Sequence, residues 1–396
     1  DDKITDLLYK CHDIATAGKS IEQVFDKIRS RYMHIAQELG LDYSPEEELE
    51  RICRNIQKGE KRDYVASRGE YLNGIILAQA LGWDFIDAAD VIFFDENGIF
   101  DAEGTNSAVA KCLSEHPYAV IPGFYGRRAD GSVKTFSRGG SDITGSIVAR
   151  AVDAELYENW TDVSGFYSAD PRIVPDAQPI ERITYAELRE LSYIGAQVLH
   201  EGTVSPVREK NIPLNIRNTN QPDHPGTMIR ERFDESQADM ESGSMITGIA
   251  GKKGFSVITL TKNGMSSELG VIRRILEVLE RYNINVEYIP SGIDSVSLVV
   301  ETGKSAPYIY QAMGDLEKEI KPDSLHLSDG MAVVAAVGRK MAFKPGSSGK
   351  IFGKLGENGI NIRMITQGPE ELNIIVGVDG PDFERAIRVL YDSFVK

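Results

Sequence analysis

The residues best suited to chemistry form a short glycine-containing run, Ser-Arg-Gly-Gly-Ser-Asp, at positions 137–142. It precedes a segment, 143–151, whose apolar residues have helical spacing. Glycines let the backbone approach a ligand closely, and the first amides of a helix attract an anion. Arg138 can bind a carboxylate through two hydrogen bonds, and Asp142 can hold Mg²⁺ beside phosphate groups. An ordinary glycine turn with Ser141 as the helix N-cap explains the spacing equally well.

A second polar loop follows a predicted strand that ends at Thr161. Ligands of open α/β sheets bind beyond the carboxyl ends of the strands, so a loop in this place is a candidate binding segment. Tyr167 can stack on a base and Arg172 can meet a phosphate. A solvated loop closed by the turn chemistry of Asp170-Pro171 is the simpler alternative. The polar residues of the loop are Thr161, Asp162, Tyr167, Asp170 and Arg172.

Two further segments carry weaker signals. Glu70, in the run Ser67-Arg-Gly-Glu70 that opens an apolar helix, can bind an ammonium group. A first-turn glutamate favoured by the helix dipole is the alternative. Thr184-Tyr-Ala-Glu187 is a capping box that predicts an amphipathic helix through His200. We interpret His200 as a helix C-cap rather than a catalyst.

The elements that position these residues are predicted from alternating patterns. Residues 1–60 have helical apolar spacing, and helical patterns then alternate with short β-rich runs at 89–94, 118–123 and 155–161. Such alternation is typical of an α/β domain with a largely parallel sheet. A polar, acidic stretch follows at 231–245 and reads as a linker. We expect a catalytic domain over 1–235 and a linker over 236–244.

An internal duplication follows the linker. Met265, Ile275 and Asn285 match Met341, Ile351 and Asn361 at a constant shift of 76 residues. Each copy has the strand–helix–strand–strand–helix pattern of a ferredoxin-like unit, with strands in the first copy at 256–261, 284–290 and 295–301. The second copy runs out of chain before its last strand, and residues 245–251 are β-like without another partner. We therefore predict a first copy at 254–328 inserted within a second copy at 245–253 and 329–396.

The composition argues against several classes of function. The formal charge of the 396 residues is −16, which argues against nucleic-acid and anionic-membrane partners. The three cysteines, Cys11, Cys53 and Cys112, lack the spacing of a zinc site and fit a reducing cytoplasm. No apolar run reaches the roughly 18 residues of a membrane span. The chain begins within a helical pattern, so we expect an upstream segment.

Together these segments resemble those of aspartate kinases in the amino-acid kinase superfamily. The resemblance spans nearly the whole chain in family order, and the C-terminal duplication resembles paired ACT domains. The motifs that carry it are Ser67-Arg-Gly-Glu70, Phe136-Ser-Arg-Gly-Gly-Ser-Asp142, Thr161-Asp162 with Gly165, Tyr167 and Asp170-Pro-Arg172, and Gly195-Ala196 with Val198-Leu-His200.

The resemblance implies an α/β fold, an amino-acid kinase αβα sandwich followed by two ferredoxin-like βαββαβ ACT domains, the first inserted in the second. It implies that ATP and L-aspartate give ADP and 4-phospho-L-aspartate, the first step of lysine, threonine and methionine biosynthesis. ATP with Mg²⁺ is the expected cofactor. We expect a cytoplasmic enzyme that pairs through its ACT domains as a homodimer or homotetramer and is regulated by an end-product amino acid.

The resemblance also implies residue roles. Glu70 would bind the ammonium of aspartate and Arg138 a carboxylate, and Ser141 and Asp142 would line the phosphoryl-transfer site. The nucleotide-binding positions are Gly139, Gly140, Thr161, Asp162, Tyr167, Asp170, Arg172 and Gln197. The effector-lining positions are Met265, Glu268, Gly270, Val271, Ile272, Asn285, Val286 and Glu287.

The effector is expected to bind beside the loop 263–268, whose amides and following helix N-terminus can take an α-carboxylate. Glu287 and Asp294 suit a cationic ligand, which favours lysine over threonine. The alternative is that both acids are simply solvated.

Two departures from the family leave other functions open. The family's N-terminal Lys-Phe-Gly-Gly-Ser segment is absent, and Gln197 and Glu201 stand where lysine and proline are usual. Gln197 and the missing lysine segment are the support for an inactive amino-acid-sensing subunit. A kinase acting on another amino acid is the second alternative, but the ACT pair and the Ser-Arg-Gly-Glu segment count against it.

Overall fold

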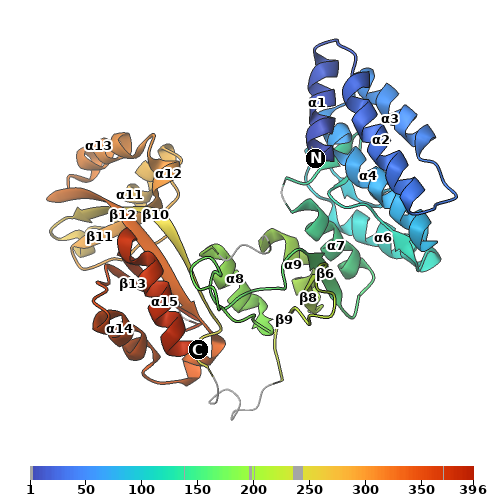
Figure 1. The fold of residues 1–396 in the computed structure, drawn as a ribbon. Helices are drawn as coiled ribbons and strands as arrows, with labels where there is room; N and C mark the ends of the chain where they lie inside the picture. Colours follow the sequence, from blue (N-terminus) through green and yellow to red (C-terminus); the bar gives the residue numbers. More distant parts are fainter. Residues whose placement is uncertain (1–2, 138, 196–198, 200, 235–243, 369) are drawn as a thin grey trace. The chain divides into compact units, whose positions relative to one another are not determined.

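A computed structural model describes residues 3–137, 139–195, 199, 201–234, 244–368 and 370–396 (Figure 1). The chain divides into two compact units, one of Asp1–Asn159 with Leu199–Asn215 and one of Trp160–Val198 with Ile216–Lys396. This division does not follow the predicted boundary at residue 235, and the predicted domain limits stay a prediction. Arg138, Gln197, His200 and most of the predicted linker lie outside the described residues. Among the residues that are described, no helix is long and apolar enough to cross a membrane.

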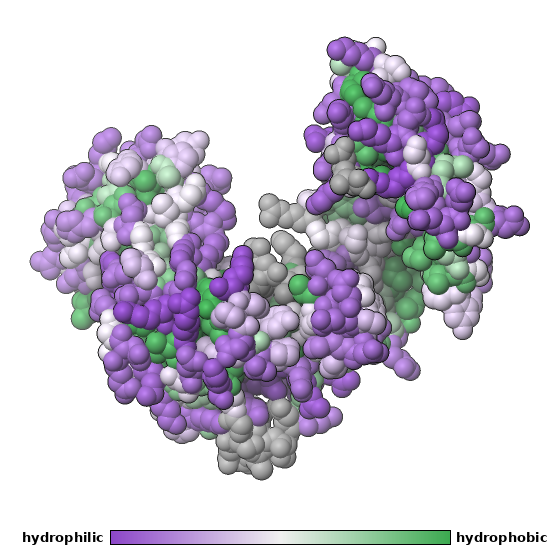
Figure 2. All heavy atoms as spheres, in the orientation of Figure 1, coloured by the Kyte–Doolittle hydropathy of each residue, from purple (hydrophilic) through white to green (hydrophobic). Residues whose placement is uncertain are grey.

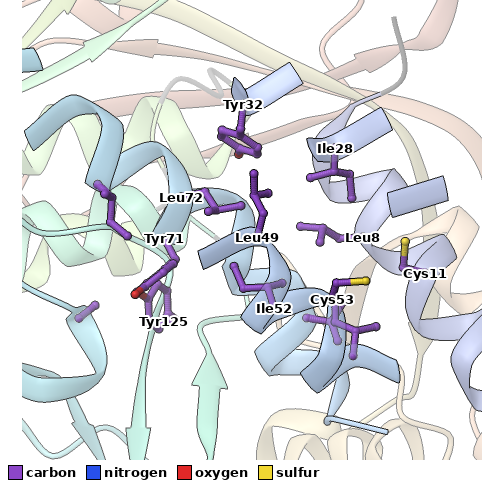
Figure 3. Close-up of a cluster of buried hydrophobic side chains, with 14 of the residues drawn as sticks. Leu8, Cys11, Ile28, Tyr32, Leu49, Ile52, Cys53, Tyr71, Leu72 and Tyr125 are labelled. Carbon is purple, nitrogen blue, oxygen red and sulfur yellow. The ribbon is translucent and has the colours of Figure 1, made fainter. Parts of the chain in front are cut away.

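The first unit begins with four helices around one apolar core. Leu8, Ile28, Leu49, Ile52 and Leu72 are almost fully buried, and Figure 3 shows them converging from different helices. Burial of such side chains is the main driving force for packing the helices together. The helices are α1 (Ile4–Thr16), α2 (Glu22–Glu38), α3 (Glu46–Gln57) and α4 (Arg62–Leu81).

The rest of the first unit is an α/β arrangement with short strands. β1 pairs in parallel with β3, and β2 pairs in parallel with β4, which pairs antiparallel with β5. The strand expected over 89–94 is wrong in its first half, because the Asp87 side chain caps a short helix there. The elements are β1 (Asp84–Phe85), α5 (Ala88–Val91), β2 (Phe93–Phe94), α6 (Ala102–Glu115), β3 (Ala119–Val120), β4 (Tyr125–Arg128), β5 (Val133–Thr135), α7 (Gly140–Ala151) and α9 (Glu201–Glu209).

The elements that precede the C-terminal region form a four-stranded sheet in the order β6-β8-β9-β7, accompanied by one helix, α8. The capping box is confirmed, since the Thr184 side chain accepts a hydrogen bond from the Glu187 amide and the Glu187 side chain accepts one from the Thr184 amide. The helix that was expected to continue through His200 ends at Tyr193. The elements are β6 (Tyr157–Thr161), β7 (Arg182–Thr184), α8 (Tyr185–Tyr193), β8 (Leu214–Asn218) and β9 (Thr227–Arg230).

The C-terminal region is built on one five-stranded antiparallel sheet in the order β11-β10-β12-β14-β13. β10 and β12 are long strands that pair along their whole length. The half of the pair in which Gly248 lies opposite Val337 belongs to the second copy. The half in which Thr261 lies opposite Ser324 belongs to the first copy. The strands are β10 (Gly248–Thr261), β11 (Ser295–Glu301), β12 (Ser324–Val337), β13 (Met364–Thr366) and β14 (Asn373–Asp379).

This shared pair of strands supplies the second copy with the strand that its own sequence lacks, so the fold-class prediction of an inserted copy is confirmed. The expected strand at 284–290 is not formed. Its residues make only an isolated bridge between Tyr288 and Val299, and Pro290, without an amide hydrogen, cannot extend the ladder. The helices are α11 (Val271–Arg281), α12 (Thr302–Ser305), α13 (Ile309–Ile320), α14 (Ser347–Glu357) and α15 (Phe383–Phe394).

Candidate functional site

The N-terminus of α7 is shaped by glycines. Gly139 is the N-cap with φ +56°, and no side chain among the described residues caps the helix, so the alternative in which Ser141 is the N-cap is wrong. A Cβ on Gly123 would lie 2.8 Å from the Ser141 Cα, and one on Gly140 would lie 2.8 Å from the Phe124 Cα. Only glycine fits where backbone packs this closely. The turn therefore presents helix amides that can receive an anion.

Asp142 is held in place by two residues of β6. Its Oδ1 accepts a hydrogen bond of 2.9 Å from the Asn159 Nδ2, and its backbone carbonyl accepts one of 3.1 Å from the Tyr157 hydroxyl. Burial raises the pKa of Tyr157 to about 12, so this hydroxyl stays a donor at neutral pH. These contacts orient Asp142 at the first turn of the helix. Sequence reasoning missed both supports, although their spacing of two residues on a strand places them on one face.

Glu70 is a largely buried carboxylate without a full set of partners. Its Oε2 is buried and has no hydrogen-bond partner among the described residues. Burial raises the pKa of the Glu70 carboxyl above its ordinary value, and the charge of Arg68 partly offsets this. Because α4 begins at Arg62, Glu70 lies well inside the helix, and the first-turn interpretation is wrong. A buried oxygen of this kind calls for a donor from a ligand.

The residues that precede Glu70 on α4 are fixed by contacts of their own. The Tyr32 hydroxyl donates to the Gly69 carbonyl at 2.9 Å. Arg68 is only 4% exposed, and its guanidinium lies 4.5 Å from the ring centre of Tyr64 and 4.4 Å from that of Tyr71. Such cation–π contacts hold a buried positive charge without a carboxylate.

The second polar loop belongs to the other unit and is anchored there. The Arg172 guanidinium binds both carboxylate oxygens of Asp170, and this contact lowers the pKa of Asp170. The Thr161 carbonyl accepts from the Thr219 amide at 2.8 Å, and Asp162 is exposed. Tyr167, Asp170 and Arg172 line one pocket of about 490 Å³. The structure thus brings these three predicted residues together.

The expected effector residues have divided surroundings. Met265 and Val271 are buried in the core of the first copy, whereas Ile272 is 42% exposed. Glu268 pairs with Lys262 and Arg274, and these contacts lower its pKa. The remaining carboxylates also have partners, because Asp294 accepts from the Gly264 amide at 2.9 Å, while Glu287 accepts from Asn285 and from the Tyr193 hydroxyl.

A metal site is supported only weakly by the side chains. The described residues contain no group of three or more His, Cys, Asp and Glu side chains arranged to hold a metal ion. Mg²⁺ in phosphoryl-transfer sites is commonly held by one or two carboxylates together with the substrate phosphates. A single oriented carboxylate at Asp142 fits that requirement.

A glycine-shaped helix N-terminus and a buried, unpartnered carboxylate are features of an enzyme that handles a charged small molecule. Comparison with known proteins is consistent with this class. Residues 17–218 match the amino acid kinase family, and residues 334–394 match an ACT domain. The chain is 32% identical over 409 residues to aspartokinase 3 of Bacillus subtilis, covering 100% of this chain and 89% of that protein.

Solved structures agree. The crystal structure of Clostridium acetobutylicum aspartate kinase superposes with a TM-score of 0.94 at 49% identity, covering 100% of this chain and 90% of that one. Escherichia coli aspartokinase III, solved with lysine and aspartate, superposes with a TM-score of 0.74 at 26% identity, covering 100% and 91%. Its complex with aspartate and ADP gives a TM-score of 0.73, also at 26% identity, covering 100% and 92%.

The chain therefore belongs to the amino acid kinase family. Within that family its relatives are aspartokinases, and this chain itself matches an ACT domain, so it is a phosphotransferase of the allosteric kind. An inactive sensing subunit and a kinase for a different amino acid are not favoured.

Proposed function

We propose that this chain transfers the γ-phosphoryl group of ATP to the side-chain carboxylate of L-aspartate, giving ADP and 4-phospho-L-aspartate for lysine, threonine and methionine biosynthesis. The observation that carries the proposal is the buried Oε2 of Glu70, which has no hydrogen-bond partner in the part of the chain that the structure describes. An ammonium group supplies the donors that this oxygen lacks. The glycine-shaped N-terminus of α7 supports the second half of the proposal, because it suits a phosphate or a carboxylate.

Different residues are proposed to bind different groups of the substrate. Glu70 binds the ammonium of aspartate, and Arg138 binds a carboxylate through its fork of donors. One oxygen of the side-chain carboxylate attacks the γ-phosphorus, the bond to the β,γ-bridging oxygen breaks, and ADP leaves. A carboxylate needs no general base, so alignment and charge neutralisation by Gly139, Gly140 and Ser141 are the protein's main contribution.

The nucleotide is assigned to the loop after β6 and to the segment after α8. Thr161, Asp162, Tyr167, Asp170, Arg172 and Gln197 are its proposed contacts. Support comes from the pocket beside Tyr167 and from the ADP bound to the Escherichia coli relative. Mg²⁺ would be held by Asp142 together with phosphate oxygens and would neutralise phosphate charge.

Arg138 offers the sharpest test of the substrate site. Arg138→Lys is expected to raise KM for aspartate far more than KM for ATP, because a point charge cannot replace a bidentate fork. Arg150→Lys is the control, since Arg150 lies on α7 and pairs with Glu209. Equal increases in both KM values would remove Arg138 from the aspartate site.

The regulatory half is proposed to sense a free amino acid, with lysine favoured over threonine. Met265, Glu268, Gly270, Val271, Ile272, Asn285, Val286, Glu287 and Asp294 remain its proposed effector positions. Two first copies are proposed to meet in a homodimer or homotetramer, because Leu269 and Ile293 are 97% and 77% exposed on that copy. Hydrophilic side chains cover much of the face of the molecule that Figure 2 shows. The free thiols support a cytoplasmic location.

A further inference from the structure

The segment at 169–177 of the second polar loop packs against the second ACT copy. Its residues Ala169, Val174 and Ala177 are buried in the core of that copy, in one cluster with Tyr391 of α15. A segment whose apolar side chains belong to the core of another element depends on that element for its shape. The conformation of the loop is therefore set in part by the second copy.

The Tyr391 hydroxyl bonds to the backbone of the loop at two points. It donates to the Asp176 carbonyl at 3.1 Å and accepts from the Gln178 amide at 3.1 Å. Tyr391 is only 1% exposed, so water competes little for these two bonds. One side chain of α15 thus fixes both a donor and an acceptor of the loop.

Arg388, three residues before Tyr391 on α15, is bonded to the loop next to Arg172. Its Nε donates to the Ile173 carbonyl at 3.0 Å, and a terminal nitrogen donates to Glu384 at 3.3 Å. Residues three positions apart on a helix lie on the same side of it. The two side chains therefore hold the backbone of the loop from one side of α15.

The same helix also borders the pocket that is assigned to the nucleotide. Phe383 and Ile387 of α15 line this pocket of about 490 Å³ together with Tyr167 and Arg172. Residues four positions apart on a helix lie on one face, and Tyr391 continues that face by one more turn. The helix α15 thus presents one face both to the pocket and to the backbone of the loop.

We propose that Arg388 and Tyr391 of the second ACT copy are positioning residues for ATP, which hold the loop so that Asp170 and Arg172 meet the nucleotide. The inference rests on the proposed nucleotide role of this loop. It gives the second copy a part in ATP binding. Glu70, which is proposed to bind aspartate, belongs to the other compact unit, so KM for aspartate should not depend on these two residues.

The first test measures initial rates with ATP and aspartate varied in turn. Arg388→Met removes the donor to the Ile173 carbonyl, so KM for ATP should rise about 3- to 10-fold while KM for aspartate stays constant. Arg385→Met is the matched control, because Arg385 lies on the same helix and its side chain is 52% exposed, against 54% for Arg388. Arg385 also pairs with an acid of its own helix, but it donates to the Gly359 carbonyl within the second copy. The control should change neither KM.

Tyr391→Phe tests the second positioning residue and keeps the buried ring. KM for ATP should again rise about 3- to 10-fold, because the Asp176 carbonyl and the Gln178 amide lose their fixed partner. Tyr282→Phe is the control, since the Tyr282 hydroxyl donates to Asp315 at 2.7 Å within the first copy. Calorimetric titration with ADP should show weaker binding for Tyr391→Phe and unchanged binding for Tyr282→Phe.

A double variant separates positioning from a purely structural role. If Arg388 acts through Arg172, Arg388→Met should raise KM for ATP less than about 2-fold in a chain that already carries Arg172→Ala. An undiminished increase in that background would overturn the positioning role. Equal increases in the KM values for ATP and aspartate would overturn it as well.

The outcomes also distinguish this inference from the proposed function. If Arg172→Ala raises KM for ATP and neither Arg388→Met nor Tyr391→Phe does, α15 does not position the loop, while the nucleotide role of the loop stands. If the unaltered chain transfers no phosphoryl group from ATP to aspartate, the proposed function is overturned, and the positioning role with it.

Discussion

Two buried glutamates, one in each compact unit, show opposite ways of placing a carboxylate inside a protein. Glu187 is fully buried and accepts hydrogen bonds from Thr184, Thr247 and both the backbone and side chain of Arg339. Glu70 is less deeply buried, yet its Oε2 has no partner in the described part of the chain. A carboxylate whose oxygens are satisfied internally stabilises the fold, whereas one left short of donors is prepared for a ligand.

The largest expected effect in this comparison is on stability, at Glu187. Glu187→Ala should lower the free energy of unfolding by about 3–5 kcal/mol, because it removes a buried carboxylate that accepts hydrogen bonds from Thr184, Thr247 and Arg339. Chemical denaturation followed by circular dichroism measures it. Glu384→Ala, which removes a carboxylate from an exposed pair with Lys253, should change little. A similar small loss in both variants would contradict the structural role of Glu187.

Glu70 should behave in the opposite way. Glu70→Gln is nearly isosteric and removes a charge that burial disfavours, so the protein should remain as stable or become slightly more stable. KM for aspartate should rise roughly 10- to 100-fold, because a charged hydrogen bond to the substrate ammonium is lost. Steady-state kinetics with each substrate varied in turn would show it. An equal rise in KM for ATP, or a loss of stability, would make Glu70 a structural residue like Glu187.

The pH dependence of KM and of stability gives a further test of the difference between Glu70 and Glu187. Burial raises the pKa of Glu70 in the folded protein, so its proton is held more tightly than in the unfolded chain. KM for aspartate should therefore begin to rise, as pH falls, above the range of an ordinary glutamate of pKa about 4.3. The stability difference between Glu70→Gln and the unaltered chain should be full above the raised pKa and should vanish below the ordinary value. A difference that is independent of pH would exclude the buried charge as its cause.

The contrast between these glutamates also shows what the sequence can predict. The capping box of Thr184 and Glu187 joins residues three positions apart, so the pattern alone predicted it. The duplication predicted helices α11 and α14 in register, and their bounds, Val271–Arg281 and Ser347–Glu357, are related by the same 76-residue shift. Local spacing and internal repetition are therefore readable without coordinates.

Contacts between residues far apart in the sequence could not be predicted from local patterns. Glu187 meets Arg339 across 152 positions, and no local pattern links them. The support of Asp142 by Tyr157 and Asn159 depends on β6 lying beside α7, which spacing within β6 could suggest but not establish. The expected strand at 284–290 is wrong because its apolar pattern did not take account of Pro290, which has no amide hydrogen to continue a ladder beside β11.

The smallest expected effect concerns Arg172. It tests whether an exposed ion pair can take part in ligand binding, as is proposed for the buried Glu70. Its side chain is 89% exposed and binds Asp170 with both oxygens engaged. Exposed pairs contribute little to stability, so Arg172→Ala should leave the melting temperature nearly unchanged. If the guanidinium meets a phosphate of ATP, KM for ATP should still rise by about 10-fold while KM for aspartate stays constant. Arg281→Ala, which breaks the exposed pair with Glu319, serves as the control. Unchanged kinetics in both variants would favour the simpler interpretation, in which the loop at 161–172 is a solvated turn and Arg172 binds no ligand.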